Sequence, residues 1–500
     1  MNGITDSMPD SVPDRPSQRV ARGSGDQPWA GEQLRSTLRV LLLPALFAVA
    51  IYGFELKPGH LGLYGFVVIL GLIVLGTLRQ GPDALLALAI MYLPLSRLYA
   101  ARLAPGLNGT NLLELGLAAV WIGLAARGRR PLFSRYPFTR VVGVWLGLSL
   151  ASVIPAVASI GLQPFLWNYL EPLRGFLDQF IIFYLFVNMI RDRDMARRLI
   201  VYVMFSAGVV FLYGIHEWWG TRGYASIEKS RLLGPLGQPN DFAALMIYSM
   251  APFLAWGVYY FPRWKSLRLA PIALAGFKVL LAAFSRGAYL AFALEGLSVS
   301  FLRGWRFFML VLAIGAGVYF FVPSLVPNSM KARVEQTYQD RVPGTEIDKS
   351  ADSRLILWQA AADMALDHPL LGVGFDQFSQ LVPSHVSGYY DGVTGGATDN
   401  QNMFLYAASN MGLPNLAAFL ILLLLAVLRG WRLYASGTAC DVDRIVGLCL
   451  VTMVAGLVGV NMFGTHVIDT AVDGFFWVML AALARLLPAD GISSSAARRA

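Results

Sequence analysis

The sequence predicts an all-α protein that crosses a membrane about twelve to fourteen times. Of its 500 residues, 56% are hydrophobic and only 14% are charged, which is more apolar material than one soluble core absorbs. Apolar runs recur and approach the length that a helix needs to cross about 30 Å of hydrocarbon. Because these runs do not alternate polar and apolar residues, they favour helices over the strands of a β-barrel. They lie at 61–78, 140–160, 239–261, 307–323, 411–428 and 444–463.

The two ends of the chain differ from the apolar sequence between them. Residues 1–37 are rich in Ser, Pro, Asp, Gly and Arg, so we expect a disordered cytoplasmic tail without the apolar core of a signal peptide. Residues 488–500 are expected to form a second cytoplasmic tail. Between the tails we expect membrane helices with short loops at 38–323, an external helical loop domain at 324–401 and C-terminal membrane helices at 402–487.

Basic residues gather in short loops between the apolar runs, and they predict the orientation of the chain. Such clusters stay on the cytoplasmic side, so the formal net charge of +9 reflects topology and not a nucleic-acid-binding face. Successive clusters leave room for two spans, which places both termini in the cytoplasm and the segments 161–175, 216–240 and 324–401 outside. The clusters lie at 127–140, 191–198, 263–268, 303–306 and 429–434 and in the terminal ARR.

Arg286 stands in the middle of an apolar stretch, LLAAFSRGAYLAFAL. A single helix over 269–302 would be about 51 Å long, far more than one crossing requires. We therefore expect two short spans with a turn at Ser285, Arg286 and Gly287, where the glycine allows a tight reversal. Arg286 then emerges on the external side, which avoids a cost of at least about 2.5 kcal/mol for burying it in the middle of the membrane.

The external loop contains the segment SADSRLILWQAAADMALDHP, which predicts an amphipathic helix that begins after Ser350 or Asp352 and ends before Pro369. Arg354 would lie in its first turn, where a cation opposes the helix dipole and favours a nearby anion. A solvated ion pair of Arg354 with Asp352 or Asp363 is an equally good interpretation. We expect the apolar face of this helix at Leu355, Trp358, Ala362 and Leu366.

Arg231, Arg286 and Arg354 reach the external side from three separate segments. Because a guanidinium binds phosphate oxygens in pairs and keeps its charge, this set indicates a site for a diphosphate. Snorkelling of each arginine toward lipid headgroups is the alternative. Lys278 lies within the first of the two short spans and is either a counter-charge for the substrate or half of a structural ion pair.

The sequence contains no pattern for a metal or an organic cofactor. Its two cysteines, Cys440 and Cys449, fall in and just after a loop expected in the cytoplasm, and the five histidines are scattered without ligand spacing. We therefore expect a site that works without metal and without a cofactor.

Four blocks of the sequence, in this order, resemble the O-antigen ligase and polymerase family. They are RLLGPLGQPNDFAALM (231–246), SRGAYLAF (285–292), SRLILWQAAADMALDHPLLGVGFDQF (353–378) and DNQNMFLYAASNMGLPNLAAFLILLLL (399–425). The resemblance covers roughly residues 200–430, and the preceding part of the chain matches only as a generic set of spans.

The resemblance implies an inner-membrane glycosyltransferase with a GT-C-like helical fold that uses undecaprenyl-pyrophosphate-linked glycans on the periplasmic face. It also implies that arginines hold the pyrophosphate, and the matched positions are Arg231 and Arg286, the latter in an Arg-x-x-x-Leu pattern that ends at Leu290. Attack by an acceptor hydroxyl at the anomeric carbon would invert its configuration. The predicted substrate-binding set is Arg231, Arg286, Arg354, Lys278, Asn240 and Asn402.

One position departs from the family pattern. Ligases of the family carry His followed by Asn, Ser or Gln, then nine residues and Gly-x-x-Gly, whereas this chain has Gln401 followed by Asn402. Gln401 cannot take a proton, so either Asp399, His385 or His368 supplies the base, or the reaction proceeds with little base assistance. Asp399 is preferred because it lies two residues away, although a role as helix cap is its alternative. The predicted catalytic set is Asp399, Arg286 and Gln401.

Three functions compete at this point. The missing histidine favours a polymerase of exopolysaccharide or O-antigen repeat units over a ligase that transfers glycan to lipid A core or to a protein. A polytopic transporter is the alternative from another class; Lys278 within a span favours it, and the lack of an internal repeat opposes it. The expected partners are a lipid-linked glycan, the lipid bilayer and chain-length regulator proteins, and no nucleic acid.

Overall fold

The computed structural model of the chain describes residues 82–99, 109–127, 135–222, 227–321, 349–386 and 400–487. Every regular element among these residues is a helix, which confirms the predicted all-α class. The predicted tails at 1–37 and 488–500 and the apolar run at 61–78 lie outside the described residues. The predicted domain boundaries and the GT-C-like arrangement stay predictions.

Six helical segments of the described part are long and apolar enough to cross a membrane. This finding makes the chain a multi-pass membrane protein, while the predicted count of twelve to fourteen spans stays a prediction. The six are α4 (Gly109–Ala126), α5 and α6 together (Thr139–Ile160), α9 (Arg193–Gly220), α11 (Pro239–Tyr260), α20 (Leu413–Ala435) and α21 (Asp441–Asn461).

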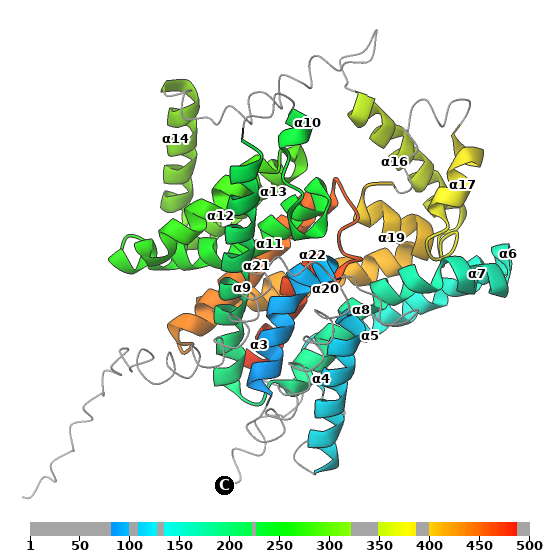
Figure 1. Ribbon diagram of the computed structural model, residues 1–500, viewed down its shortest axis with the longest axis horizontal. Coiled ribbons are helices and arrows are strands. Elements are labelled where there is room, and N and C mark those ends of the chain that lie inside the picture. The colour runs from blue at the N-terminus through cyan, green and yellow to red at the C-terminus, as the bar shows by residue number, and fades with distance from the viewer. Residues whose placement is uncertain are drawn as a thin grey trace, which may run out of the picture.

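The other described helices complete the bundle. They are α3 (Asp83–Tyr92), α7 (Leu162–Asn168), α8 (Leu170–Met189), α10 (Ile227–Ser230), α12 (Ala270–Ala282), α13 (Arg286–Arg303), α14 (Trp305–Phe321), α16 (Lys349–Asp367), α17 (Phe378–His385), α19 (Met403–Met411) and α22 (Thr470–Leu486), with the 3-10 turns η1 (Leu93–Tyr99), η2 (Gly234–Leu236) and η3 (Trp264–Leu269). α21 packs against α11, α13 and α20, and α22 packs against α8 and α9. α11 and α21, the most buried of the six candidate spans, therefore stand at the centre (Figure 1).

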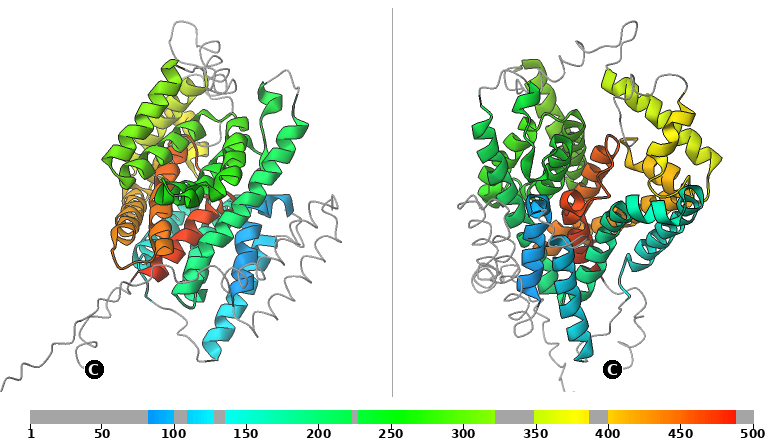
Figure 2. Two further views of the ribbon diagram at one scale, coloured as in Figure 1. Left: turned by 90° about the vertical axis from the view of Figure 1, so that its left-hand side faces the viewer. Right: turned by 45° about the vertical axis from the view of Figure 1, so that its right-hand side comes forward.

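α16 and α17 lie at the same end of the bundle as α10, and the loop between α21 and α22 rises toward them (Figures 1 and 2). The two helices share a small apolar cluster that is separate from the main core. The cluster consists of Leu357, Ala360, Ala361, Met364, Val373, Phe378 and Val382. Packing in this cluster and against α19 holds α16 in place and thereby positions its side chains.

The apolar stretch 269–302 is broken into two helices, α12 and α13, as predicted. The predicted role of Gly287 is wrong, because Gly287 lies inside the first turn of α13 and Phe284 is the residue with left-handed backbone, at φ 51°. A β-carbon at Gly287 would press on the side chain of Phe463, so the glycine serves close packing. The break itself places Arg286 at the first position of α13.

The predicted details of α16 need correction as well. The helix includes Lys349, so Arg354 lies in its second turn and not in its first. Leu355 and Leu366 are 48% and 72% exposed, whereas Leu357 and Met364 are fully buried. The helix carries two apolar stripes, and contacts with α17 and α19 bury the stripe that the sequence pattern did not favour.

Aspartates hold pairs of arginines at the end of the molecule where α9 begins. Asp443, at the start of α21, accepts hydrogen bonds from Arg197 Nε at 2.7 Å and from Arg193 at 3.3 Å. Asp83, at the start of α3, accepts from Arg198 at 2.9 Å and from Arg191 at 3.1 Å. These carboxylates fasten the start of α9 to α3 and α21.

Candidate active site

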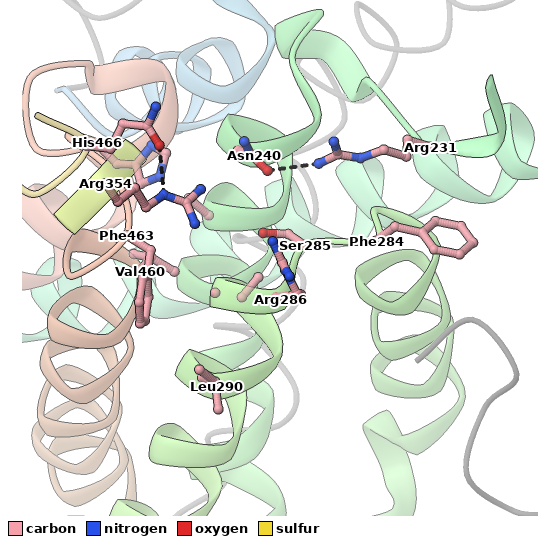
Figure 3. A pocket seen from close by; sticks show the side chains of 14 residues that line it. Arg231, Asn240, Phe284, Ser285, Arg286, Leu290, Arg354, Val460, Phe463 and His466 are labelled. Atoms are coloured by element: carbon pink, nitrogen blue, oxygen red, sulfur yellow. Dashed lines mark hydrogen bonds between the residues drawn. The ribbon is translucent and has the colours of Figure 1, made fainter. Parts of the chain in front are cut away.

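A cavity of about 450 Å³ lies at the opposite end of α11 and α21 (Figure 3). Its volume is within the range of sites for small ligands. Segments far apart in the sequence form its wall, from the loop before α11 to the loop after α21. The lining residues are Arg231, Asn240, Ala244, Phe284, Ser285, Arg286, Gly287, Ala288, Leu290, Arg354, Gln401, Val460, Phe463 and His466.

The cavity brings together most of the residues predicted from the sequence. Arg231, Asn240, Arg286, Arg354 and Gln401 all line it. Figure 3 shows the three arginine side chains turned toward the same space from different sides, while the ring of Phe284 points away. Separate segments of the chain therefore converge on one positively charged site.

Arg231 is positioned by the carbonyl groups at the end of α12. Its Nε donates to the carbonyl of Ala283 at 3.3 Å, and the backbone N–H of Leu232 donates to the carbonyl of Ala282 at 3.3 Å. Its Nη2 donates to Oδ1 of Asn240, in the first turn of α11, at 2.8 Å. These bonds hold the guanidinium at the cavity wall.

Arg286 is held at the cavity by the turn between α12 and α13. Ser285 precedes α13 with an extended backbone, and the hydroxyl of Tyr289 donates to the carbonyl of Leu281 at 2.6 Å across the turn. A cation in the first turn of a helix adds to the positive end of the helix dipole instead of balancing it. The turn therefore concentrates positive potential where an anion would bind.

Arg354 reaches the cavity from α16 and binds Gln401. Its Nε donates to Oε1 of Gln401 at 2.8 Å. Gln401 has a left-handed backbone with φ 50°, and Nε1 of Trp358 donates to the carbonyl of Asn400 at 2.9 Å. The strained backbone and this second bond fix Gln401 against α16, so its amide orients the guanidinium.

The structure does not bring every predicted residue to the cavity wall. Asn402 caps α19, because its Oδ1 accepts from the N–H groups of Phe404 and Leu405 at 3.0 and 3.1 Å. Lys278 is exposed, with its Nζ 4.5 Å from the ring centroid of Trp218. Asn402 and Lys278 are absent from the lining, and their proposed contacts with substrate stay predictions.

The candidate bases named from the sequence lie elsewhere or outside the described residues. Asp399 is not among the described residues. His368 and His385 are exposed and do not line the cavity. Nδ1 of His385 lies 3.1 Å from Oγ of Ser384 and 3.0 Å from the carbonyl of Leu381, so local bonds account for this ring.

His466 lines the cavity, and the sequence reasoning missed it. Its Nδ1 lies 3.3 Å from Oδ1 of Asp241, in the first turn of α11. Asp241 also accepts a hydrogen bond from Arg97 Nη1 at 2.8 Å. The available signal was topological: basic clusters at 429–434 and at the C-terminus place the short segment MFGTHVID on the external side, with the arginines.

The arrangement suits a ligand with a strongly anionic group and an apolar part. Three guanidiniums provide planar donors that match phosphate oxygens and stay charged. Ala288, Leu290 and Val460 add apolar surface to the same wall, and Leu290 is 56% exposed. A phosphate group bound by the arginines would thus lie beside an apolar surface.

Comparisons with known proteins assign part of the chain to a family. Residues 271–420 match the family described as O-antigen ligase, which confirms the resemblance noted in the sequence. The matched region contains Arg286, Arg354 and Gln401, whereas Arg231 and His466 lie outside it. No curated protein matches the chain.

Proposed function

From the match of residues 271–420 to the O-antigen ligase family, we propose that this protein polymerises glycan repeat units carried on undecaprenyl pyrophosphate. The family supports O-antigen ligase or polymerase activity in general and a membrane glycosyltransferase as the class of enzyme. The proposed product is an exopolysaccharide or an O-antigen. The proposed site of reaction is the periplasmic face of a bacterial inner membrane, with both termini in the cytoplasm.

The convergence of Arg231, Arg286 and Arg354 on one cavity is the observation that carries the proposal. A diphosphate has several oxygens and more than one negative charge, so guanidiniums from different directions complement it. The fixed turn before α13 and the amide partners of the other two arginines hold the groups in place before the ligand arrives. Such preorganisation lowers the cost of stabilising charge in a transition state.

The arginines assist the departure of the leaving group. As the bond between the anomeric carbon and the phosphate oxygen breaks, negative charge grows on undecaprenyl pyrophosphate. Guanidiniums at that position stabilise this charge more strongly in the transition state than in the bound donor. An acceptor hydroxyl attacks the anomeric carbon from the opposite side, so the new linkage has inverted configuration.

The apolar wall supports a lipid-linked donor. Leu290 is exposed in a membrane protein and lines the same cavity as the arginines. A polyprenyl chain leaving the diphosphate would contact such a surface on its way to the hydrocarbon. This contact explains why the family pattern places a leucine four residues after the arginine, one turn along α13.

Ligation is the second candidate, and the name of the matched family, O-antigen ligase, favours it. Glutamine at position 401, where ligases of the family carry histidine, favours polymerisation. The two reactions share the donor and the leaving group and differ only in the acceptor. The acceptor therefore decides between them in an experiment.

The test uses purified protein with a synthetic undecaprenyl-pyrophosphate oligosaccharide, a metal chelator, and lipid A core added or omitted. We expect a ladder of lipid-linked products without added acceptor, and we expect Arg286→Ala to lower turnover about a hundredfold or more. Arg303→Ala is the matched control, because Arg303 ends the same helix and donates to the carbonyl of Phe261 at 2.9 Å. Product that appears only with lipid A core would show that the protein is a ligase and not a polymerase. Unchanged turnover in Arg286→Ala would refute the role of the arginine.

A further inference from the structure

We infer that His466, oriented by Asp241, is the general base that takes the proton of the acceptor hydroxyl. The inference rests on the proposed glycosyl transfer and adds to it the group that activates the acceptor. In this proposal the general base comes from the loop between α21 and α22, whereas the family pattern places it at position 401.

The first argument is the position of the ring beside Gln401. Both residues line the cavity. The N–H of Met403 donates to the carbonyl of Gly464 at 3.0 Å, and Nδ2 of Asn402 donates to the carbonyl of Met462 at 3.3 Å. These bonds dock the loop that carries His466 onto the segment that carries Gln401, so two segments distant in sequence present their side chains to one space.

The second argument is the tautomer that Asp241 selects. With Nδ1 of His466 at 3.3 Å from Oδ1, the carboxylate favours a proton on Nδ1 and leaves Nε2 with its lone pair. Nε2 makes no hydrogen bond within the described part of the chain, and it is not fully buried. The nitrogen that can accept a proton is therefore not fully enclosed, and it belongs to a residue that lines the cavity.

The third argument is the balance of charge around Asp241. Arg97 binds Asp241 through Nη1 and Asp469 through Nη2, so one cation serves two carboxylates. A net negative charge is therefore left beside the imidazole of His466, where positive charge develops during the proposed transfer. The three arginines line the same cavity as His466, so a phosphate bound by them would share this space with the imidazole ring.

The fourth argument is that the ring is fixed. The backbone N–H of His466 donates to Oδ1 of Asn461 at 2.9 Å, and Nδ2 of Asn461 donates to the hydroxyl of Tyr248 at 3.2 Å and to the carbonyl of Leu457 at 2.9 Å. The absence of a side chain at Gly464 leaves the space that the imidazole fills, since a β-carbon there would overlap Nε2. A base that is held in place loses little entropy in the transition state.

In the proposed step the acceptor oxygen forms a bond to the anomeric carbon as the bond from that carbon to the phosphate oxygen breaks. The electron pair of the broken bond leaves on undecaprenyl pyrophosphate. The hydroxyl proton moves to Nε2 of His466, and Asp241 stabilises the imidazolium that forms. The proton then passes to water, which restores the neutral base for the next transfer.

The test measures turnover and donor binding separately, with undecaprenyl pyrophosphate as the binding probe. We expect His466→Ala to lower kcat about 10²- to 10³-fold, with binding of the probe within about twofold of wild type, and we expect added imidazole to restore part of the rate. Arg286→Ala should instead lose binding. A His466→Ala protein with turnover within about threefold of wild type would overturn the base and leave the proposed transfer intact.

Asp241 is a positioning residue, and Asp241→Asn tests it with the shape of the side chain preserved. We expect about tenfold lower kcat with unchanged KM, and an acid limb of the rate profile that moves to lower pH, because the imidazolium has lost a neighbouring negative charge. A merely structural role would leave the profile in place. If His466→Ala does not fold, His466→Gln tests the same group with a side chain of similar size, and turnover within about threefold of wild type would overturn the base. Wild-type protein that binds the probe and transfers no sugar would overturn the proposed function itself.

Discussion

Arginine side chains are held differently at the two ends of α9. At its start, the carboxylate of Asp443 is 1% exposed and binds Arg197 and Arg193. Asp83 holds a second pair there. These ion pairs join α9 to α3 and α21, and they neutralise charge within the fold.

Near the other end of α9, the carboxylate of Glu217 fixes the backbone of the loop before α11, with the N–H groups of Leu233 and Gly234 at 2.8 and 2.9 Å. The arginines of the cavity bind amide oxygens, Arg231 that of Asn240 and Arg354 that of Gln401. An amide oxygen accepts a hydrogen bond without carrying charge, so these two bonds orient the guanidiniums and add no negative charge beside them. The bonds near Asp443 and Asp83 join cations to anions, whereas these two bonds at the cavity join a cation to a neutral amide.

The largest effect should come from turning an amide of the cavity into a carboxylate. Asn240→Asp keeps the shape of the side chain and places a carboxylate against Arg231, as Asp443 does against Arg197. We expect binding of undecaprenyl pyrophosphate to weaken about a hundredfold, because the new carboxylate competes with phosphate for the guanidinium and repels it. Gln401→Glu should act the same way through Arg354. Binding within about twofold of wild type, measured by titration in detergent, would contradict the distinction.

Removing a carboxylate at the start of α9 should lower the stability of the fold and leave ligand binding unchanged. Asp443→Asn removes the buried charge shared by Arg193 and Arg197, and we expect a loss of about 2 kcal/mol because both guanidiniums regain only part of their hydration. Thermal unfolding in detergent measures the loss. The folded fraction should bind undecaprenyl pyrophosphate as wild type does, and a selective loss of binding would show that this cluster acts on the cavity.

A smaller effect should follow from restoring the histidine of the family pattern. In a His466→Ala background, Gln401→His places an imidazole next to the empty position, and we expect kcat to rise about tenfold from the level of the single variant. The gain is limited because the new histidine lacks Asp241 as its partner. No recovery would indicate that the wall near position 401 does not contact the acceptor.

The smallest effect should come from Lys278→Met. The ammonium lies over the ring of Trp218 and outside the lining of the cavity, so we expect turnover within about twofold of wild type. A loss of tenfold or more in the same assay would support the contact with substrate that the sequence suggested for Lys278.

Much of the cavity could be predicted because its charged residues differ clearly from the sequence around them. Arg286 stands out in an apolar run, and the length of that run requires a break that the structure places between α12 and α13. Arg231 and Arg354 stand on segments that the basic clusters assign to the same side. Membrane topology alone therefore brought residues from distant segments to one end of the bundle.

Other features could not be predicted because they depend on pairing between distant segments. The sequence marks neither Asp241 nor His466, since each is a single polar residue near the end of a span and only packing brings them together. The buried face of α16 was predicted wrongly for a similar reason: two apolar stripes were available, and contacts with α17 and α19 decided between them. The left-handed residue of the turn is Phe284, while Gly287 packs closely against Phe463, a contact between distant segments that the sequence does not mark.

The neighbouring positions of Gln401 and His466 bear on how related sequences are classified. A chain with glutamine in place of the motif histidine would be sorted among inactive homologues by a linear pattern. Here His466 lines the same cavity as Gln401, although it stands on a segment outside the pattern. Relatives without the motif histidine are therefore better judged by whether any imidazole with a carboxylate partner reaches this space.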